Sequence, residues 1–517
     1  MLARVHSAAL LGIDARVLEV EVDVGRGLPS FTIVGLPDAT VREARERVRS
    51  ALRNSGLPFP SGAITVNLAP AEWRKGGAGL DLAVAIALLS IGGWQPRTAR
   101  RRVFIGELGL SGQVRPVRGA LSLALATSEA GFEEIVLPAS NAPETACVDG
   151  LGVAAVRSLA DAVGYLSGER PERERPVLPA APPQAVFTVD FAEVRGQEVA
   201  RRALEIAAAG GHHVLLTGPP GAGKTMLARR LPTILPPLSR PESIEATRIH
   251  SAAGRLPAGA GLLATPPFRA PHHGISAAGL VGGGGRPAPG EISLAHRGVL
   301  FLDELPEFRR DVLEAIRQPL EERQIAVVRV GGAFVFPCDF LLVAAMNPCP
   351  CGHAGDTRRA CACDDGSRAR YTRKISGPLL DRMDLHVAVP AVEWRELARK
   401  AFPEASTTIR RRVGEARERA AARLPGIAAF RNADLPIGEL ERFAALDTAG
   451  RRLAERAVTR LALSVRGLHR ALRVARTIAD LEGSSRVMAS HLAEAISYRR
   501  RTFPDLSGRL DRVPAAP

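Results

Sequence analysis

The segment that decides the fold reads Gly218-Pro219-Pro220-Gly221-Ala222-Gly223-Lys224-Thr225 and follows the apolar run Val214-Leu215-Leu216. It has the spacing G-x-x-x-x-G-K-T of a phosphate-binding loop, in which glycines let successive backbone N–H groups point at a phosphate. The helix-compatible run after it adds the positive end of a helix dipole. We expect Lys224 to reach the β- and γ-phosphates of ATP and the Thr225 hydroxyl to hold Mg²⁺. A Gly-Pro turn that only reverses the chain is the weaker alternative, because every position of the motif is filled.

Two further apolar runs end in polar side chains that suit a nucleotide site. The run 298–302 ends in the carboxylates Asp303 and Glu304, and the run 340–346 ends in Asn347. The first has the form of a Walker B strand, so we expect Asp303 to join the Mg²⁺ shell and Glu304 to polarise the water that attacks the γ-phosphate. The Asn347 amide would orient the same water. With the phosphate-binding loop, these runs predict a parallel sheet that binds ATP at its carboxyl edge.

Length and charge limit the class of protein. A chain of 517 residues is too long for one core and predicts two to four domains. The formal charge of +15 and the pI near 10.6 favour an acidic partner, above all nucleic acid. A GC-rich genome that encodes Arg at ordinary surface positions is the alternative explanation. The apolar patch after Arg4 is short, and the most apolar stretch, 80–94, is interrupted by Asp81 and glycines. We therefore expect no signal peptide, no membrane span and a cytoplasmic location.

A charged, proline-rich segment at 169–186 divides the chain, because its composition cannot form a core and suits a stiff spacer. We predict four segments: 1–168, this linker, a nucleotide-binding core at 187–391, and an Arg-rich helical region at 392–517. Asp38 is a suitable N-cap for a first helix. The predicted strands before the linker are 16–24, 31–34, 63–68, 103–106 and 134–138, and the predicted helices there are 39–54, 81–89 and 119–130.

Seven stretches, in this order, carry a resemblance to a known family: 195–198, 218–225, 269–273, 289–296, 301–304, 347–352 and 376–382. Residues from about 187 to 500 resemble the magnesium-chelatase-like branch of the AAA+ ATPases, and the whole chain resembles the ComM/YifB family of bacterial DNA motors. The resemblance implies an α/β chain. It would consist of a Lon-protease-like α+β domain, a central AAA+ P-loop domain with a parallel sheet, and a C-terminal helical lid.

The resemblance also assigns roles to two arginines. Arg382, in Leu380-Asp381-Arg382, stands where the family places an arginine finger, which completes the active site of the neighbouring subunit. Arg466, in Ser464-Val465-Arg466, stands at the sensor 2 position of the lid. A guanidinium at either place would neutralise charge on the transferring phosphoryl group; the alternative is that each is one of many surface arginines. A finger that acts on a neighbour requires a ring, and the resemblance implies a hexamer.

The first domain resembles the proteolytic domain of Lon and the C-terminal domain of the recombination protein RadA, through 74–79, 106–112 and 133–138. Lon's serine–lysine dyad has no counterpart here, since 76–79 hold only Gly and Ala and 119–124 hold no Lys. A serine needs an amine base to become a nucleophile in such a dyad. We therefore expect a non-catalytic domain that forms the ring or contacts DNA.

Four of the six cysteines cluster in the sequence, as Cys349, Cys351, Cys361 and Cys363. Two pairs of thiolates can supply four tetrahedral ligands to Zn²⁺, and disulfides are unfavourable in a cytoplasmic chain. The C-x-C spacing is tighter than the usual C-x-x-C. Two interpretations stay open: a Zn²⁺ site, or reduced thiols that pack the loop, with one pair alone in a redox role. The other two cysteines are expected to be buried.

The segment 253–290 is too long and too rich in Gly, Pro and Ala for a simple connection, and by resemblance it holds the helix-2 insert of this clade. Its His272-His273 pair is expected to be structural or to face DNA, because adjacent side chains diverge and suit a metal poorly. Farther on, 324–336 predicts a β-hairpin with its turn at Gly331-Gly332. In the family's clade this hairpin faces the pore of the ring, so Arg329 is expected to meet a DNA phosphate; a solvated surface charge is the alternative.

Three functions fit these motifs. The best supported is an ATP-driven, Mg²⁺-dependent ring motor on single-stranded or branched DNA, such as a helicase or branch-migration factor in recombination or natural transformation. A chelatase-type motor that remodels a protein partner is the second, and the Lon-like first domain argues against it. An ATP-dependent protease is the third, and the missing dyad disfavours it.

Overall fold

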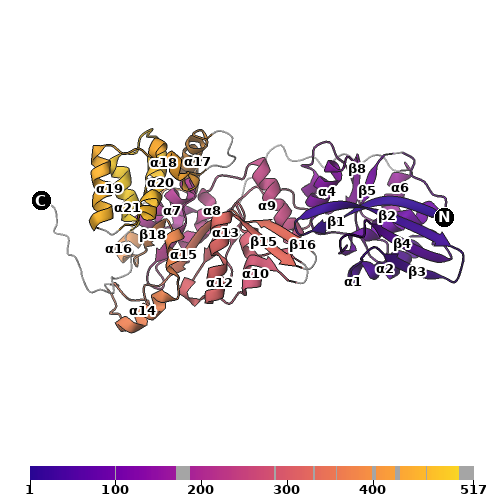
Figure 1. The fold of residues 1–517 in the computed structure, drawn as a ribbon, viewed down its shortest axis with the longest axis horizontal. Coiled ribbons are helices and arrows are strands. Elements are labelled where there is room, and N and C mark those ends of the chain that lie inside the picture. Colours follow the sequence, from indigo (N-terminus) through magenta and orange to yellow (C-terminus); the bar gives the residue numbers. More distant parts are fainter. Residues whose placement is uncertain are drawn as a thin grey trace.

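The computed structural model is elongated, with an N-terminal lobe and a set of C-terminal helices at opposite ends of a central sheet domain (Figure 1). Of the predicted linker 169–186, residues 170–186 lie outside the described residues. Within the described residues, no helix has both the length and the apolarity that a membrane span requires. The structure describes residues 1–98, 100–169, 187–284, 287–329, 332–356, 358–398, 403–424, 431–460 and 463–499.

The N-terminal lobe is built on a seven-stranded mixed sheet in the order β3-β4-β2-β1-β5-β8-β9. Antiparallel pairing joins β1 to β2 and β2 to β4, and the other neighbours are parallel. The helix α3 is buried along nearly its whole length, as its unbroken apolar sequence requires. The main elements are β1 (Leu2–Leu11), β2 (Asp14–Gly25), β3 (Ser30–Val34), α1 (Ala39–Arg42), α2 (Ala44–Asn54), β4 (Ala63–Ala69), α3 (Asp81–Ile91), β5 (Arg102–Phe104), β6 (Glu107–Leu108), β7 (Val114–Arg115), α4 (Ala120–Glu129), β8 (Glu134–Pro138), α5 (Ala142–Thr145), β9 (Gly152–Val156) and α6 (Leu159–Leu166).

The first predicted helix has the expected cap. The Asp38 carboxylate accepts a hydrogen bond from the Val41 N–H at 2.9 Å, which satisfies one of the free donors at a helix start. The prediction of one helix over 39–54 is wrong in one respect, because the chain leaves the helix at Glu43 and forms α1 and α2 in its place.

The central domain holds a five-stranded sheet in the order β11-β14-β17-β10-β18, parallel throughout. Four of its strands are short apolar runs, and β10, β14 and β17 are completely buried, which is the usual pattern of a parallel sheet covered on both faces. The predicted α/β core with a parallel sheet is therefore confirmed. The strands are β10 (Val214–Thr217), β11 (Phe268–Arg269), β14 (Val299–Leu302), β17 (Leu341–Met346) and β18 (Leu385–Ala388), and the helices are α7 (Glu198–Gly210), α8 (Lys224–Ile234), α9 (Arg240–Ala252), α10 (Ala277–Val281), α11 (Glu291–Leu294), α12 (Arg310–Ala315), α13 (Arg317–Glu322), α14 (Asp365–Arg373) and α15 (Gly377–Arg382).

The strand order fixes where the predicted site residues lie. The phosphate-binding loop follows β10, Asp303 follows β14 and Asn347 follows β17, and these three strands are neighbours in the order β14-β17-β10. Since the strands are parallel, all three segments meet at the carboxyl edge of the sheet. Arg382 ends α15 just before β18 begins, so it lies at the opposite edge.

The C-terminal region is helical, as predicted. Its long helix α17 packs on α7 and α8 of the central domain, and α20 packs on α21, α17 and α7. Figure 1 shows these helices together at the end of the molecule farthest from the N-terminal lobe. They are α16 (Trp394–Leu397), α17 (Ser406–Ala421), α18 (Ile437–Phe443), α19 (Thr448–Arg460), α20 (Val465–Leu481) and α21 (Ala489–Ser497).

The predicted hairpin is present as β15 (Gln324–Arg329) and β16 (Gly332–Pro337). The predicted turn at Gly331-Gly332 is wrong for Gly332, because pairing of Arg329 with Gly332 continues the antiparallel ladder to that residue. Gly331 and the side chain of Arg329 lie outside the described residues.

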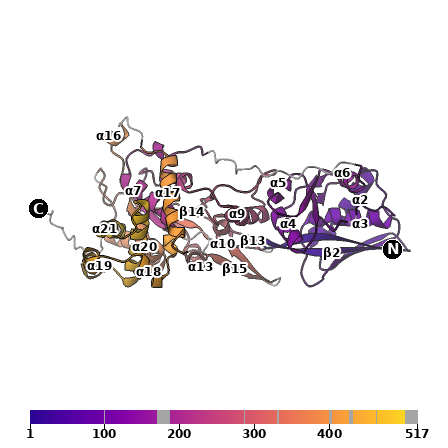
Figure 2. The same ribbon diagram turned by 90° about the horizontal axis from the view of Figure 1, so that it is seen from above.

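The hairpin also touches the N-terminal lobe. The turn between β1 and β2 places Gly12 against Phe334 of β16, where an added Cβ would stand 3.0 Å from the Phe334 ring. Ile13 of the same turn belongs to the apolar cluster that contains Phe336. Figures 1 and 2 both show the hairpin next to the end of the lobe that faces the central domain. Beside it, Arg248 of α9 pairs with Asp14 at 2.7 Å, so the contact is partly polar.

Candidate functional site

The phosphate-binding loop holds its lysine inward. The backbone takes left-handed conformations at Gly221 (φ 77°) and Gly223 (φ 90°), which a glycine adopts without steric cost. Lys224 is 9 % exposed, and its Nζ donates to the carbonyl oxygens of Gly218 at 2.6 Å and Pro219 at 3.0 Å. Burial lowers the pKa of this amine, while the carboxylates of the site raise it. The amine is thus held among acceptors that a phosphate could replace.

The third acceptor for Lys224 comes from the next strand. Asn347, at the end of β17, accepts from Lys224 Nζ through Oδ1 at 3.1 Å. This amide lies at the carboxyl edge of the sheet beside the lysine, so the structure brings together two residues that the sequence placed in the same site.

The proposed Mg²⁺ ligands are in contact. The Thr225 hydroxyl donates to Asp303 Oδ2 at 2.6 Å, and the two residues come from the start of α8 and the end of β14. A hydroxyl and a carboxylate oxygen at the same point are the hard oxygen donors that Mg²⁺ prefers, and Mg²⁺ takes its other ligands from water and phosphate. The residues present therefore fit the metal that the sequence predicts.

Glu304 stands in an uncommon backbone conformation. Its φ is 52°, a left-handed value that costs free energy for a residue other than glycine and is concentrated at functional sites. The backbone N–H of Glu304 donates to Asp303 Oδ1 at 3.0 Å, and its side chain is 58 % exposed. The carboxylate therefore lies at the open side of the site, next to Asp303, which is expected to bind Mg²⁺.

The carboxylate of Glu304 has a partner that sequence analysis missed. His273 Nδ1 lies 3.4 Å from Glu304 Oε2, and the His273 ring packs on His272 and against the edge of Phe308. The segment with His273 follows β11, which pairs with β14, so both residues leave the sheet side by side. A structural or DNA-facing role was expected for these histidines. Because β11 has only two residues, no strand pattern in the sequence indicates the pairing of His273 with Glu304.

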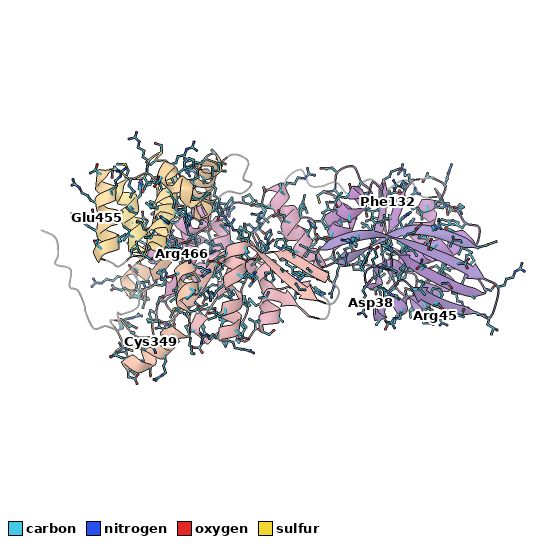
Figure 3. All side chains as sticks on the ribbon, viewed as in Figure 1. Asp38, Arg45, Phe132, Cys349, Glu455 and Arg466 are labelled. Carbon is cyan, nitrogen blue, oxygen red and sulfur yellow. The ribbon has the colours of Figure 1, made fainter. Side chains whose placement is uncertain are left out.

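The two predicted arginines meet at one carboxylate. Arg382 donates through Nη2 to Glu321 Oε1 and through Nη1 to the Pro378 carbonyl at 2.7 Å. Arg466, near the start of α20, donates to the same Glu321 oxygen at 3.3 Å. In Figure 3 Arg466 lies between the outer helices, where Glu455 is labelled, and the central domain. Both arginines are thus at the edge of the sheet opposite to the phosphate-binding loop of their own chain.

The four clustered cysteines converge, although they come from two stretches of one loop. Their sulfur atoms all lie within 4.8 Å of one another, with Cys349 Sγ 3.4 Å from Cys351 Sγ and 3.6 Å from Cys361 Sγ. Four sulfurs about 2.3 Å from a tetrahedral Zn²⁺ would stand about 3.8 Å apart. Backbone N–H groups of Cys351 and Ala354 point at sulfurs of the cluster. The geometry therefore fits a Zn²⁺ ion, and Figure 3 shows Cys349 at the border of the central domain.

The cysteine loop packs on the phosphate-binding loop. At Gly352 (φ 83°) an added Cβ would stand 2.5 Å from Cδ of Pro220. Only a glycine fits this close approach without displacing the proline ring. The loop that carries the four cysteines is therefore in direct contact with the loop that is expected to hold ATP.

Family models cover most of the chain. The model described as magnesium chelatase, subunit ChlI, matches residues 190–397, and the model of its C-terminal part matches 403–499. A third model, subunit ChlI of Mg-chelatase, matches 20–141. With the parallel sheet and the candidate nucleotide-site residues at its edge, these matches define an AAA+ ATPase of the magnesium-chelatase type.

Curated relatives match nearly the full length. The protein YifB of Escherichia coli is 43% identical over 502 residues, which cover 96% of this chain and 97% of YifB. Competence protein ComM of Haemophilus influenzae is 41% identical over 506 residues, with the same two coverages, 96% and 97%. Lon protease 2 of Bacillus subtilis is 33% identical over 141 residues, 26% of each chain. The chain belongs to the ComM/YifB family, and its first lobe is Lon-like.

Proposed function

We propose that this chain is an ATP-hydrolysing ring motor that acts on single-stranded or branched DNA in the cytoplasm, as a helicase or branch-migration factor in recombination or natural transformation. One observation carries the proposal: a phosphate-loop lysine, a Thr–Asp pair and a polar amide meet at one edge of the parallel sheet, and an arginine stands at the other edge. Such a subunit would offer the phosphate-binding part of an active site at one edge and an arginine at the other. In a ring of identical subunits, each site would then combine parts of two neighbours.

The residues of the loop edge have separate tasks in this proposal. Lys224 exchanges its loop carbonyls for phosphate oxygens, and Asn347 orients the attacking water. Glu304 accepts the proton of that water as the phosphoryl group leaves. Mg²⁺ held by Thr225 and Asp303 would neutralise charge on the phosphates.

The opposite edge serves the next subunit in the same proposal. Arg382 would reach the γ-phosphate of a neighbouring chain, and Arg466 stands beside it. A guanidinium there stabilises the charge of the transferring phosphoryl group. The ring is proposed to be a hexamer, with its first lobe a non-catalytic ring-forming or DNA-contacting unit.

DNA is the proposed substrate for three reasons. The chain carries a formal charge of +15, and the strand β15 ends in Arg329, which is proposed to meet a phosphate. A relative of nearly the same length is named Competence protein ComM. A remodelling motor that acts on a protein partner is the second candidate, favoured by the chelatase models that match most of the chain.

DNA should raise the rate of ATP hydrolysis. The measurement compares turnover without DNA, with single-stranded DNA, with duplex and with a four-way junction, at one fixed salt concentration because phosphate contacts weaken with salt. Arg329→Gln should respond less to DNA than the parental chain, while Arg310→Gln on α12 is a matched control for loss of one arginine. ATP hydrolysis that no DNA alters would contradict the DNA motor and favour the protein-remodelling candidate.

We also propose that Cys349, Cys351, Cys361 and Cys363 hold one structural Zn²⁺. Elemental analysis of the purified chain should find about one zinc per subunit if all four thiolates bind it. Cys361→Ser should lose the metal, and Cys147→Ser, which changes a buried thiol outside the cluster, should keep it. Because the cysteine loop packs on Pro220, chelation of the zinc should also weaken ATP binding. A folded chain without metal would contradict the zinc site.

A further inference from the structure

Glu321 is a single carboxylate shared by two arginines. Its Oε1 accepts hydrogen bonds from Nη2 of both Arg382 and Arg466. The Glu321 side chain is 49% exposed, whereas that of Arg382 is 9% exposed. Within the described residues, Nε of Arg382 has no hydrogen-bond partner, and its other contact is the Pro378 carbonyl of its own helix. Glu321 is therefore the charged partner of a nearly buried guanidinium.

Positive charge exceeds negative charge at Glu321 itself. Two guanidinium groups share this one carboxylate, while a third positive neighbour, Arg317, is paired with Glu314 at 2.5 Å. Burial lowers the pKa of Arg382, Glu321 raises it, and the charges of Arg466 and Arg317 lower it further. A site with this excess of positive charge attracts an additional anion, and phosphate oxygens match the planar donors of a guanidinium.

We propose that Glu321 is a releasable counter-ion, which occupies the guanidinium donors that Arg382 and Arg466 need for a neighbouring subunit's phosphate. The inference rests on the proposed function of Arg382 as an arginine finger. In the subunit as it stands, the carboxylate and an incoming phosphate compete for the same Nη2 atoms. Hydrolysis at the interface then requires that Glu321 moves away.

The surroundings of Glu321 allow this movement. Glu321 and Arg382 line a polar cavity of about 110 Å³ at the edge of the sheet. The carboxylate is half exposed on a flexible side chain, at the position before the last residue of the six-residue helix α13. Side-chain rotation into water or into this cavity releases the arginines without any change in the helix.

The position of Glu321 in the chain links this release to the hairpin. Helix α13 ends at Glu322, Arg323 turns the chain with a left-handed φ of 55°, and β15 begins at Gln324. The Cys338 N–H donates to the Arg323 carbonyl at 2.9 Å, which closes the base of the hairpin. A displacement of the hairpin would thus move the C-terminal end of α13, where Glu321 lies. DNA bound at the hairpin would displace the carboxylate and free the two arginines.

The test is Glu321→Gln, which keeps the size of the side chain and an acceptor oxygen but removes the charge. Because Glu321 is half exposed, water competes with its pairing to the arginines, so ATP hydrolysis without DNA should rise only about two- to five-fold. The further increase caused by DNA should shrink by the same factor, because the restraint that DNA relieves is already gone. Glu321→Ala is the second variant, with the same expectation.

The control is Glu322→Gln on the neighbouring position. The Glu322 carboxylate accepts a hydrogen bond from Gln318 of the same helix at 2.8 Å. The Glu322→Gln variant should therefore leave the rates of ATP hydrolysis with and without DNA unchanged. The double variant Glu321→Gln/Arg382→Ala should be as inactive as Arg382→Ala, because the gain passes through the arginine.

The outcomes separate this inference from the proposed function. If Arg382→Ala abolishes hydrolysis while Glu321→Gln leaves the DNA-free rate unchanged or lowers it, the arginine finger stands and the counter-ion role is wrong. A double variant that keeps the increased rate would also overturn it. If Arg382→Ala hydrolyses ATP at the parental rate, the finger is wrong and the counter-ion role with it.

Discussion

Glu304→Gln should bind ATP and turn it over about 10²- to 10⁴-fold more slowly than the parental chain, the range of losses when a general base is removed. An amide of the same size cannot take the proton of the attacking water. The groups proposed to hold the nucleotide lie elsewhere, in Lys224 and in the hydrogen-bonded pair of Thr225 and Asp303. Equilibrium binding of a fluorescent ATP analogue and single-turnover hydrolysis measure the two effects separately.

A carboxylate one turn away provides the control for this experiment. Glu307 lies 3.5 Å from Lys374 and has no contact with the phosphate-binding loop among the described residues. Glu307→Gln should keep the parental turnover. Turnover near the parental rate in Glu304→Gln would remove Glu304 from water activation, and loss of ATP binding would show that its role is to hold the nucleotide.

A mixture of two inactive variants should regain ATPase activity. Arg382→Ala lacks the finger and Lys224→Ala lacks the phosphate clamp, so each alone should lose roughly 10³-fold or more, the range that a finger contributes. The two residues lie at opposite edges of the sheet. In a mixed ring, an Arg382→Ala subunit can present its intact loop to the intact finger of a Lys224→Ala neighbour, which rebuilds one complete site.

Subunit exchange must be shown independently, for example by energy transfer between two labelled variants. Lys224→Ala mixed with Lys224→Ala/Arg382→Ala is the matched control, because no interface in that mixture has an intact loop. If mixed rings form and activity stays at background, the role of Arg382 in trans is wrong.

The meeting of the candidate nucleotide-site residues at one edge of the sheet could be predicted, because each of them follows a strand that the sequence marks. One apolar run leads through the glycine loop to Lys224 and Thr225. Two other runs are followed by Asp303 and by Asn347, and the parallel sheet brings the ends of all three runs together. Local sequence is enough to predict such a site, because its residues are those that directly follow the parallel strands.

Contacts between distant segments could not be predicted in the same way. The pairs His273–Glu304 and Arg382–Glu321 depend on side-chain packing across elements that no periodicity connects. In the N-terminal lobe, β1 was not predicted. The alanine-rich stretch that it contains is only a short apolar patch by composition, and its strand conformation comes from pairing with β2 along its whole length. Tertiary pairing decided the structure there, not propensity.

Through the contact of Gly12 with Phe334, the turn between β1 and β2 abuts strand β16 of the hairpin. The two strands run from this contact toward the far end of the lobe (Figure 1), and β2 has 12 residues, which span roughly 40 Å at about 3.3 Å per residue. A tilt of roughly 10° at the contact would carry the far end of such a pair about 7 Å. The lobe also packs on α9 through α4, and Arg240 of α9 pairs with Asp149 at 2.8 Å. The hairpin and α9 therefore fix the direction of the lobe together, and a tilt of both would be enlarged at its far end.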